Sequence, residues 1–314
     1  MNLLTKATLF ITIIVAFTNC ETRVLKEAII PVNPAHFIKE SLITDISKEM
    51  HALSKGPKVE CYKITTKSVP HEHKMGPWCP KHINDSKENG GIWFEKGKVY
   101  DVDGHFISNI GEFYSDKKWK LYNEDGSIKV TLTQEQCEGA AKPNVEEIYH
   151  NYCVECNPAF YAKNVTTYYL PTTPIWTDAA SRGGRGTPMG LAFNGVNFDP
   201  PAPTDAILRA HTLAPLDDCG GHVNPHTGYH YHAVTGCTKE VPQTDNHAPM
   251  IGYAMDGFGI YGLKDKEGNS PTDLDDCGGH EDELRGYHYH AGDPGSNQII
   301  KCLNGAFGEM IVSH

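Results

Sequence analysis

A Tyr-His-Tyr-His motif occurs twice in the chain, within the pentapeptides Gly-Tyr-His-Tyr-His at residues 228–232 and 286–290. In an extended strand, side chains two residues apart point to the same face of the sheet. His230 and His232 are therefore expected to point together to one face, with the two tyrosines on the other. Paired imidazoles of this kind are common ligands of transition metals.

A third histidine accompanies each pair. The motif Leu-Asp-Asp-Cys-Gly-Gly-His precedes each pentapeptide at the same spacing and ends at His222 or His280. Its two glycines allow a sharp backbone turn that would bring this histidine to the other two. The sequence thus predicts two sets of candidate ligands. They are His222, His230 and His232 in the first copy, and His280, His288 and His290 in the second.

Three protein ligands would leave one coordination position open, as catalytic and transport sites do. An imidazole-rich set favours copper or zinc over calcium. The neighbouring aspartates are candidates to orient the imidazoles from a second layer. They are Asp217, Asp218, Asp275 and Asp276. The alternative is a metal-free network of hydrogen bonds among histidine, aspartate and tyrosine. We favour metal binding because the same three histidines recur in both copies.

The chain has ten cysteines, which in a secreted protein indicate a disulfide framework. Cys219 and Cys277 could be metal ligands, but we expect each to pair with the later cysteine of its own copy. The expected disulfides are Cys219–Cys237 and Cys277–Cys302. Cys153-x-x-Cys156 favours structural disulfides over redox chemistry, because no thioredoxin-like pattern surrounds it.

One further cluster holds His71, His73 and His82. These histidines could form a separate metal site, although a solvated loop with a disulfide at Cys79 is the favoured interpretation. No serine-hydrolase, phosphate-binding or dinucleotide-binding motif occurs.

Tandem duplication explains the recurrence of these motifs. Residues 189–198 match residues 251–260, and the motifs that follow keep one common offset. Both copies have the same order of motifs. Gly-x-Ala-x-Asn/Asp-Gly comes first, then Asp-x-Cys-Gly-Gly-His, then Tyr-His-Tyr-His. In this order the chain resembles the YHYH domain family of secreted proteins over about residues 160–305. The resemblance implies an extracellular β-rich domain and implies no particular reaction.

The expected fold is mainly β, with antiparallel hairpins, a few short helices, disulfide links and a duplicated pseudo-two-fold β domain. We predict a signal peptide at 1–20, an N-terminal cysteine-containing region with hairpins at 21–157, and a YHYH domain at 158–314. The tandem repeats within that domain span 189–237 and 251–302.

Three segments outside the repeats also carry structural predictions. Alternating residues within 90–114 and 119–133 predict hairpins. Residues 36–55 predict a short amphipathic helix. Residues 171–188, rich in proline, threonine and glycine, are typical of a linker or an extended arm.

The N-terminal segment predicts secretion, because a lysine and an apolar run precede small or polar residues. In a eukaryotic secretory pathway, the sequons at Asn84 and Asn164 would be glycosylation candidates. No other segment of the chain is a candidate membrane span.

The formal net charge of −11 argues against nucleic acid as a partner, because binding phosphate needs a basic surface. The function we expect is binding of a metal ion by a secreted protein, without catalysis. One alternative is a component of the extracellular matrix or of a biomineral, for which acidity and secretion count more than the histidines. The other is a metal-dependent hydrolase or copper oxidoreductase.

Overall fold

The computed structural model describes residues 29–56, 58–142, 144–183 and 186–314. The predicted signal peptide at 1–20, including Cys20, lies outside the described residues. Within them the protein is mainly β, with four short α-helices and four disulfides. The predicted fold class, mainly β with antiparallel pairing and disulfide links, is confirmed. No described helix has the length and apolar character needed to cross a membrane.

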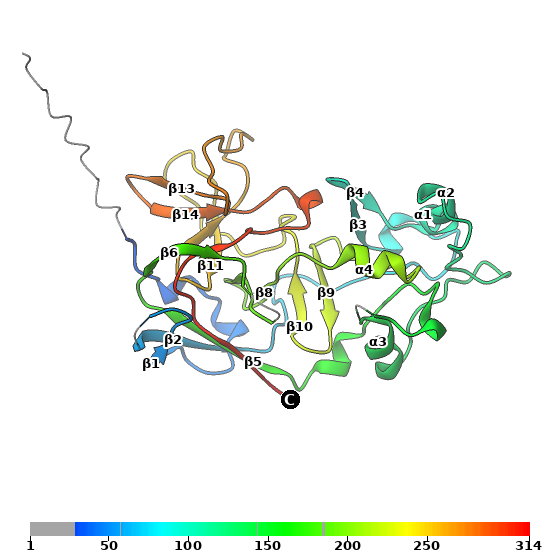
Figure 1. Ribbon diagram of the computed structural model, residues 1–314, viewed down its shortest axis with the longest axis horizontal. Coiled ribbons are helices and arrows are strands. Elements are labelled where there is room, and N and C mark those ends of the chain that lie inside the picture. The colour runs from blue at the N-terminus through cyan, green and yellow to red at the C-terminus, as the bar shows by residue number, and fades with distance from the viewer. Residues whose placement is uncertain (1–28, 57, 143, 184–185) are drawn as a thin grey trace, which may run out of the picture.

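The largest sheet contains both repeats and has eight strands, in the order β13-β14-β12-β11-β7-β8-β10-β9 (Figure 1). The first repeat supplies β7 (Gly190–Ala192), β8 (Asn197–Phe198), β9 (Gly221–Asn224) and β10 (Gly228–Tyr231). The second repeat supplies β11 (Met250–Ala254), β12 (Gly259–Tyr261), β13 (Gly279–Asp282) and β14 (Gly286–His290).

Each repeat builds two hairpins in the order that the motifs predict. The first hairpin turns at Asn194-Gly195 between β7 and β8, or at Asp256-Gly257 between β11 and β12. The second hairpin carries the histidines, on β9 and β10 or on β13 and β14. The two hairpins join through a parallel pair, β8 with β10 or β12 with β14.

The two repeats meet at the antiparallel pair of β7 and β11. From this pair outward, the strands of both repeats follow the same order. A Cβ atom on Gly190 would lie 2.6 Å from the carbonyl oxygen of Tyr253, and one on Gly252 would lie 2.4 Å from that of Leu191. Only glycine fits so close an approach, which explains its matched positions in the two repeats. The pseudo-two-fold relation stays a prediction, because strand order specifies no rotation.

A second sheet, in the order β1-β2-β5-β16, combines strands from both ends of the chain. Its strands are β1 (Ser47–Ala52), β2 (Lys58–Thr66), β5 (Val165–Pro171) and β16 (Met310–Ser313). Two smaller sheets pair β3 (Ile92–Glu95) with β4 (Lys98–Asp101) and β6 (Trp176–Ser181) with β15 (Leu303–Gly305). The pairing of β2 with β5 crosses residue 157, where we place a domain boundary; the domain division stays a prediction.

The predicted helix at residues 36–55 is wrong. Single 3₁₀ turns occupy Pro34–His36 and Lys39–Ser41, and the second half of the segment is β1. Every residue of β1 is paired with β2, and the ion pairs Lys48–Glu60 and Lys63–Glu49 join the two strands. This tertiary pairing overrides a local apolar period that is compatible with a helix.

The hairpin predicted within residues 90–114 is correct only for its first part. β3 and β4 turn at Lys96-Gly97, where both residues have positive φ, at 50° and 76°. The remainder forms α1 (Gly104–Ser108) and α2 (Ile110–Phe113). The Asp103 carboxylate caps α1 by accepting a hydrogen bond from the backbone N–H of Phe106 at 2.7 Å. Asp103-Gly104 therefore begins a helix here and does not form a β-turn.

Two other segments differ in part from expectation. Within 119–133, the predicted hairpin is reduced to an irregular one, with a bridge between Tyr122 and Ile128 and backbone hydrogen bonds from Asn123 to Ser127 and from Lys129 to Leu121. Residues 171–188 are not simply a linker, because β6 pairs with β15 near the C-terminus. The remaining helices are α3 (Gln134–Ala140) and α4 (Thr204–Arg209).

The disulfides pair cysteines within two separate parts of the chain. Cys79 bonds to Cys153 and Cys137 to Cys156, which joins both cysteines of the Cys-x-x-Cys motif to distant partners. Cys219 bonds to Cys237 and Cys277 to Cys302, the within-repeat pairs that the sequence favours. Cys61 is a buried free thiol, and burial raises its pKa to about 11. A thiol of such high pKa is poorly reactive.

Candidate metal centres

The first centre is the group of His222, His230 and His232. His222 and His230 are direct cross-strand partners on β9 and β10, and His232 follows two residues further along the same face. The Nε2 atom of His232 lies 3.1 Å from Nε2 of His230 and 3.1 Å from Nε2 of His222. Register and strand alternation therefore bring the three imidazoles together.

The second centre contains His280, His288 and His290 and one residue that the sequence did not indicate, His247. His280 and His288 are cross-strand partners on β13 and β14. The Nε2 atom of His288 lies 3.0 Å from that of His280 and 3.0 Å from that of His247. His290 Nε2 lies 3.1 Å from His280 Nε2. His247 precedes β11 with no repeated motif around it, so no local pattern could have identified it.

Backbone carbonyls determine which nitrogen carries the proton in five of these imidazoles, those of His230, His232, His247, His288 and His290. A carbonyl oxygen only accepts hydrogen bonds, so an Nδ1 atom facing one must be the N–H donor. His230 and His288 donate to the carbonyls of Gly228 and Gly286, at 3.0 and 2.8 Å. His247 donates to the carbonyl of Ala248 at 2.9 Å. In a neutral imidazole held this way, Nε2 carries the unshared lone pair that a metal requires.

The convergence of these Nε2 atoms has a direct electrostatic consequence. In pairs such as His230 with His232, or His288 with His247, neither imidazole can donate from Nε2, because each neutral ring carries its proton on Nδ1. Two lone pairs 3.0–3.1 Å apart repel each other unless a cation lies between them. Tetrahedral coordination at the usual zinc–nitrogen distance places ligand nitrogens roughly 3.3 Å apart. Both centres therefore have a geometry that could hold a metal ion.

The four aspartates expected to orient the imidazoles do not do so. Asp217 accepts hydrogen bonds from the Tyr229 hydroxyl, and Asp275 accepts one from the Tyr287 hydroxyl. Both carboxylates also cap the Cys-Gly-Gly turns by accepting from backbone N–H groups. Asp218 and Asp276 are exposed. The one carboxylate that holds an imidazole Nδ1 is Asp273, 2.9 Å from His280.

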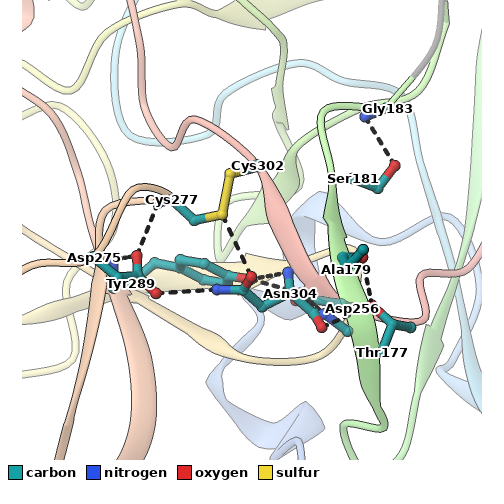
Figure 2. Close-up of a disulfide and its surroundings, with 12 residues drawn as sticks. Thr177, Ala179, Ser181, Gly183, Asp256, Asp275, Cys277, Tyr289, Cys302 and Asn304 are labelled. Atoms are coloured by element: carbon teal, nitrogen blue, oxygen red, sulfur yellow. Dashed lines mark hydrogen bonds between the residues drawn. A yellow bond between two sulfur atoms is a disulfide. The ribbon is translucent and has the colours of Figure 1, made fainter.

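The tyrosines of the motif lie on the opposite face of the strands and are buried. Figure 2 shows the Tyr289 ring beside the Cys277–Cys302 disulfide, with its hydroxyl between Asp256 and Asn304. The Tyr289 hydroxyl donates to the Asp256 carboxylate at 2.7 Å and accepts from the backbone N–H of Asn304 at 2.7 Å. These tyrosines fasten the strands to the core and provide no ligand to either centre.

The comparison with protein families identifies the same region of the chain. Residues 167–273 match the family model described as YHYH protein. The chain contains a YHYH region. The match includes the whole of the first repeat and ends before β13, so the second Tyr-His-Tyr-His motif lies beyond it. No curated protein and no solved structure matches the chain.

Four of the motif histidines, His222, His232, His288 and His290, are held in the neutral form. Burial, together with the neighbouring imidazoles, lowers the pKa of His222 and His232 well below the usual value. Burial also lowers the pKa of His288 to about 3 and that of His290 to about 4. Protons therefore compete weakly for these nitrogens at neutral pH, as a metal site requires.

The two centres differ in what lies beside them, although their strand histidines are equally buried. His230 and His232 are 1% and 4% exposed, and His288 and His290 are 1% and 3% exposed. The second centre forms part of the wall of a cavity of about 400 Å³. The wall includes His247, His280, His290, Arg285, Asp245 and Asn269. The Arg285 guanidinium is already bound by Asp245 and Asp282, at 2.7 and 2.8 Å.

The cluster of His71, His73 and His82 is not assembled into one site. His73 Nε2 lies 3.3 Å from the Tyr229 hydroxyl, whereas His82 Nε2 lies 3.0 Å from the backbone carbonyl of Asp125. His73 does lie near the sulfurs of Cys219 and Cys237. Those sulfurs form a disulfide and offer no thiolate to a metal.

The two sequons have different surroundings. Asn84 is exposed. Asn164 is buried, its Oδ1 lies 3.0 Å from His314 Nδ1, and its Nδ2 is enclosed. Both sequons therefore stay candidates for glycosylation, and Asn84 is the more accessible of the two.

Proposed function

We propose that this is a secreted protein that binds transition metal ions, copper or zinc, at both centres, in a binding or structural role without turnover. The observation that carries the proposal is the convergence of Nε2 lone pairs from imidazoles whose Nδ1 protons are held by carbonyls. The predicted signal peptide and the four disulfides support secretion into an oxidising compartment.

A metal-free network explains this arrangement less well than a bound metal does. Such a network would place a hydroxyl or carboxyl group between the imidazoles, as the tyrosines and aspartates do on the opposite face. On the histidine face, Nε2 atoms meet one another directly. Nitrogen ligands of this type bind copper and zinc in preference to calcium or magnesium.

The test is elemental analysis of the secreted protein, purified without a histidine tag. We expect about two copper or zinc ions per chain, one for each centre, after equilibration with either metal. The ions should be lost when His230, His232, His288 and His290 are all changed to Ala. Wild-type protein that stays metal-free and takes up neither metal would refute the proposal.

A matched variant controls for the number of histidines removed. Four exposed histidines, His71, His105, His226 and His314, lie outside both centres. Changing these four to Ala should leave the metal content unchanged. Circular dichroism and non-reducing electrophoresis should show that both variants retain their fold and disulfides.

The cavity beside the second centre favours a second candidate, metal-dependent turnover of a small molecule. The metal-loaded protein would be assayed with a chromogenic ester and, in air, with a phenol. Turnover that disappears in the four-histidine variant would support an enzyme, and a lack of turnover at full metal occupancy would support binding alone.

A further inference from the structure

The two repeats hold their imidazoles with equivalent backbone groups. His232 Nδ1 donates to the carbonyl of Pro200 at 2.7 Å, and His290 Nδ1 donates to that of Gly262 at 2.8 Å. The offset between residues 189–198 and 251–260 also matches Pro200 with Gly262. The preceding residues, Asp199 and Tyr261, therefore occupy corresponding places at the end of β8 and β12.

The Asp199 carboxylate faces the first centre. Its Oδ2 lies 3.6 Å from His230 Nε2, and its side chain is only 17% exposed. Asn197 donates a short hydrogen bond to the other carboxylate oxygen. Within the described residues, Asp199 forms no ion pair with lysine or arginine. Burial raises the pKa of the Asp199 carboxyl, and the nearby His230 and the hydrogen bond from Asn197 offset this effect only in part.

The second centre has a different group in this place. The Tyr261 ring packs edge-on against His247, with centroids 4.8 Å apart. His247 brings its Nε2 to within 3.0 Å of His288 Nε2. The carboxylate that faces His288 Nε2, that of Asp282, lies 4.0 Å away and is held by Arg285 at 2.8 Å. His247 thus gives the second centre a fourth imidazole, and the second repeat has Tyr261 at the place of Asp199.

We infer that Asp199 is the fourth metal ligand of the first centre. The duplicated sites then have different donor sets, three imidazoles with one carboxylate in the first and four imidazoles in the second. The inference deepens the proposed function and rests on it, because it presupposes that the histidines bind metal. An anionic ligand in a buried site holds a divalent cation more firmly than a neutral one. The first centre is therefore closed and retains its metal, whereas the second, beside the cavity, exchanges metal more readily.

The experiment isolates the first centre in the full-length chain. The parent variant carries His280→Ala and His290→Ala, which remove two ligands of the second centre. Its zinc affinity is measured by competition with a chromophoric chelator, with and without Asp199→Asn. We expect one zinc per chain in the parent and an affinity lower by about 100-fold with Asp199→Asn, the upper end of the range for perturbed metal-site residues.

Two further variants provide controls. Asp199→Glu keeps a carboxylate and should lose less affinity than Asp199→Asn. Tyr261→Phe, at the corresponding place of the second repeat, should leave the affinity of the first centre unchanged. An unchanged affinity with Asp199→Asn would overturn the assignment of Asp199 while the proposed function survives. A parent that binds no zinc, with a wild type that binds none, would refute the proposed function itself.

A measurement on the parent alone decides the matter if Asp199→Asn does not fold. In the Co²⁺ form, a water molecule at the fourth position would lose a proton near pH 7 and change the visible spectrum. A carboxylate ligand has no such transition. We expect a spectrum that is constant between about pH 6 and about pH 9, and a titration in that range would overturn the inference.

Discussion

At the scale of single residues, backbone carbonyls decide which nitrogen carries the proton in four of the motif imidazoles. His230, His232, His288 and His290 all donate from Nδ1 to a carbonyl of a neighbouring loop or turn. The side chains therefore present the same nitrogen, Nε2, toward the centre of each group. Burial reinforces the neutral form of His232, His288 and His290, because it disfavours the charged imidazolium.

The lowered pKa values predict how the metal-free protein responds to acid. His288 and His290 have a pKa of about 3 and about 4 in the folded state, below the ordinary value of 6.5. Below pH 6.5 the unfolded chain thus binds more protons at these residues than the folded chain. Their contribution to stability is present above that pH and is lost as the pH falls.

The measurement is the thermal unfolding temperature of metal-free protein between about pH 7 and about pH 5. Asp256, whose pKa burial raises to about 6, acts in the opposite direction, because the folded state binds the additional proton. Asp256 is present in both the wild type and the four-histidine variant, so its effect cancels when the two are compared. We expect the wild type to lose more stability on acidification than the variant. Parallel curves would show that the histidines are not held neutral.

At the scale of elements, the Cys-Gly-Gly turn anchors each histidine strand. The backbone N–H of His232 donates to the carbonyl of Gly220 at 2.8 Å, and that of His290 donates to the carbonyl of Gly278 at 2.8 Å. Gly220 and Gly278 have φ of 78° and 89°, which glycine adopts readily. The turn therefore sets the position of the last histidine in each centre.

These two glycines are not equally replaceable. A Cβ atom at Gly278 would meet only the carbonyl oxygen of His290, at 3.6 Å, whereas one at Gly220 would lie 2.5 Å from the carbonyl oxygen of Ala233. We expect Gly278→Ala to cost about 1–2 kcal/mol, from the left-handed conformation alone. Gly220→Ala should cost more, because the backbone of Ala233 must also move. Urea unfolding of both variants checks this, and equal losses would contradict it.

At the scale of the whole molecule, the eight-stranded sheet joins the repeats while the motif histidines of each centre stay within their own repeat. The first centre lies on β9 and β10, near one edge of the sheet, and the second lies on β13 and β14, at the other (Figure 1). A separate disulfide secures each Cys-Gly-Gly turn. Damage to one repeat should therefore affect the nearer centre most.

The Cys277–Cys302 disulfide tests this independence. It closes a separation of 25 residues, so changing both cysteines to Ser should lower the free energy of unfolding by about 3 kcal/mol. The second centre should bind metal less tightly, because Gly278 follows Cys277 directly and its carbonyl accepts the hydrogen bond from the backbone of His290. The first centre should keep its metal. The reciprocal variant, with Cys219 and Cys237 changed to Ser, should bind metal more weakly at the first centre and keep the metal of the second. Elemental analysis measures this in chains where the histidines of the other centre are changed to Ala.

Local pattern was sufficient for much of the architecture. Strand alternation, Asn-Gly and Asp-Gly turns and the repeated spacing predicted the β class, the hairpins of each repeat and the shared face of the histidines. The six histidines of the two motifs lie in two groups because His222 and His280 are cross-strand partners of His230 and His288. Spacing carries this information since antiparallel register depends on the length of the connecting turn.

The sequence by itself determined the β fold class, the duplication and the grouping of the six motif histidines. Each can be inferred from strand alternation, turn residues and repeated spacing, which are local features of the chain. Only the tertiary structure decided which residues complete each centre. His247 lies 41 residues before His288, and Asp199 reaches His230 through the parallel pairing of β8 and β10. The carbonyls of Pro200 and Gly262, not the neighbouring aspartates, orient the imidazoles. Every residue has a carbonyl, so which one faces a histidine depends on the packing of distant segments.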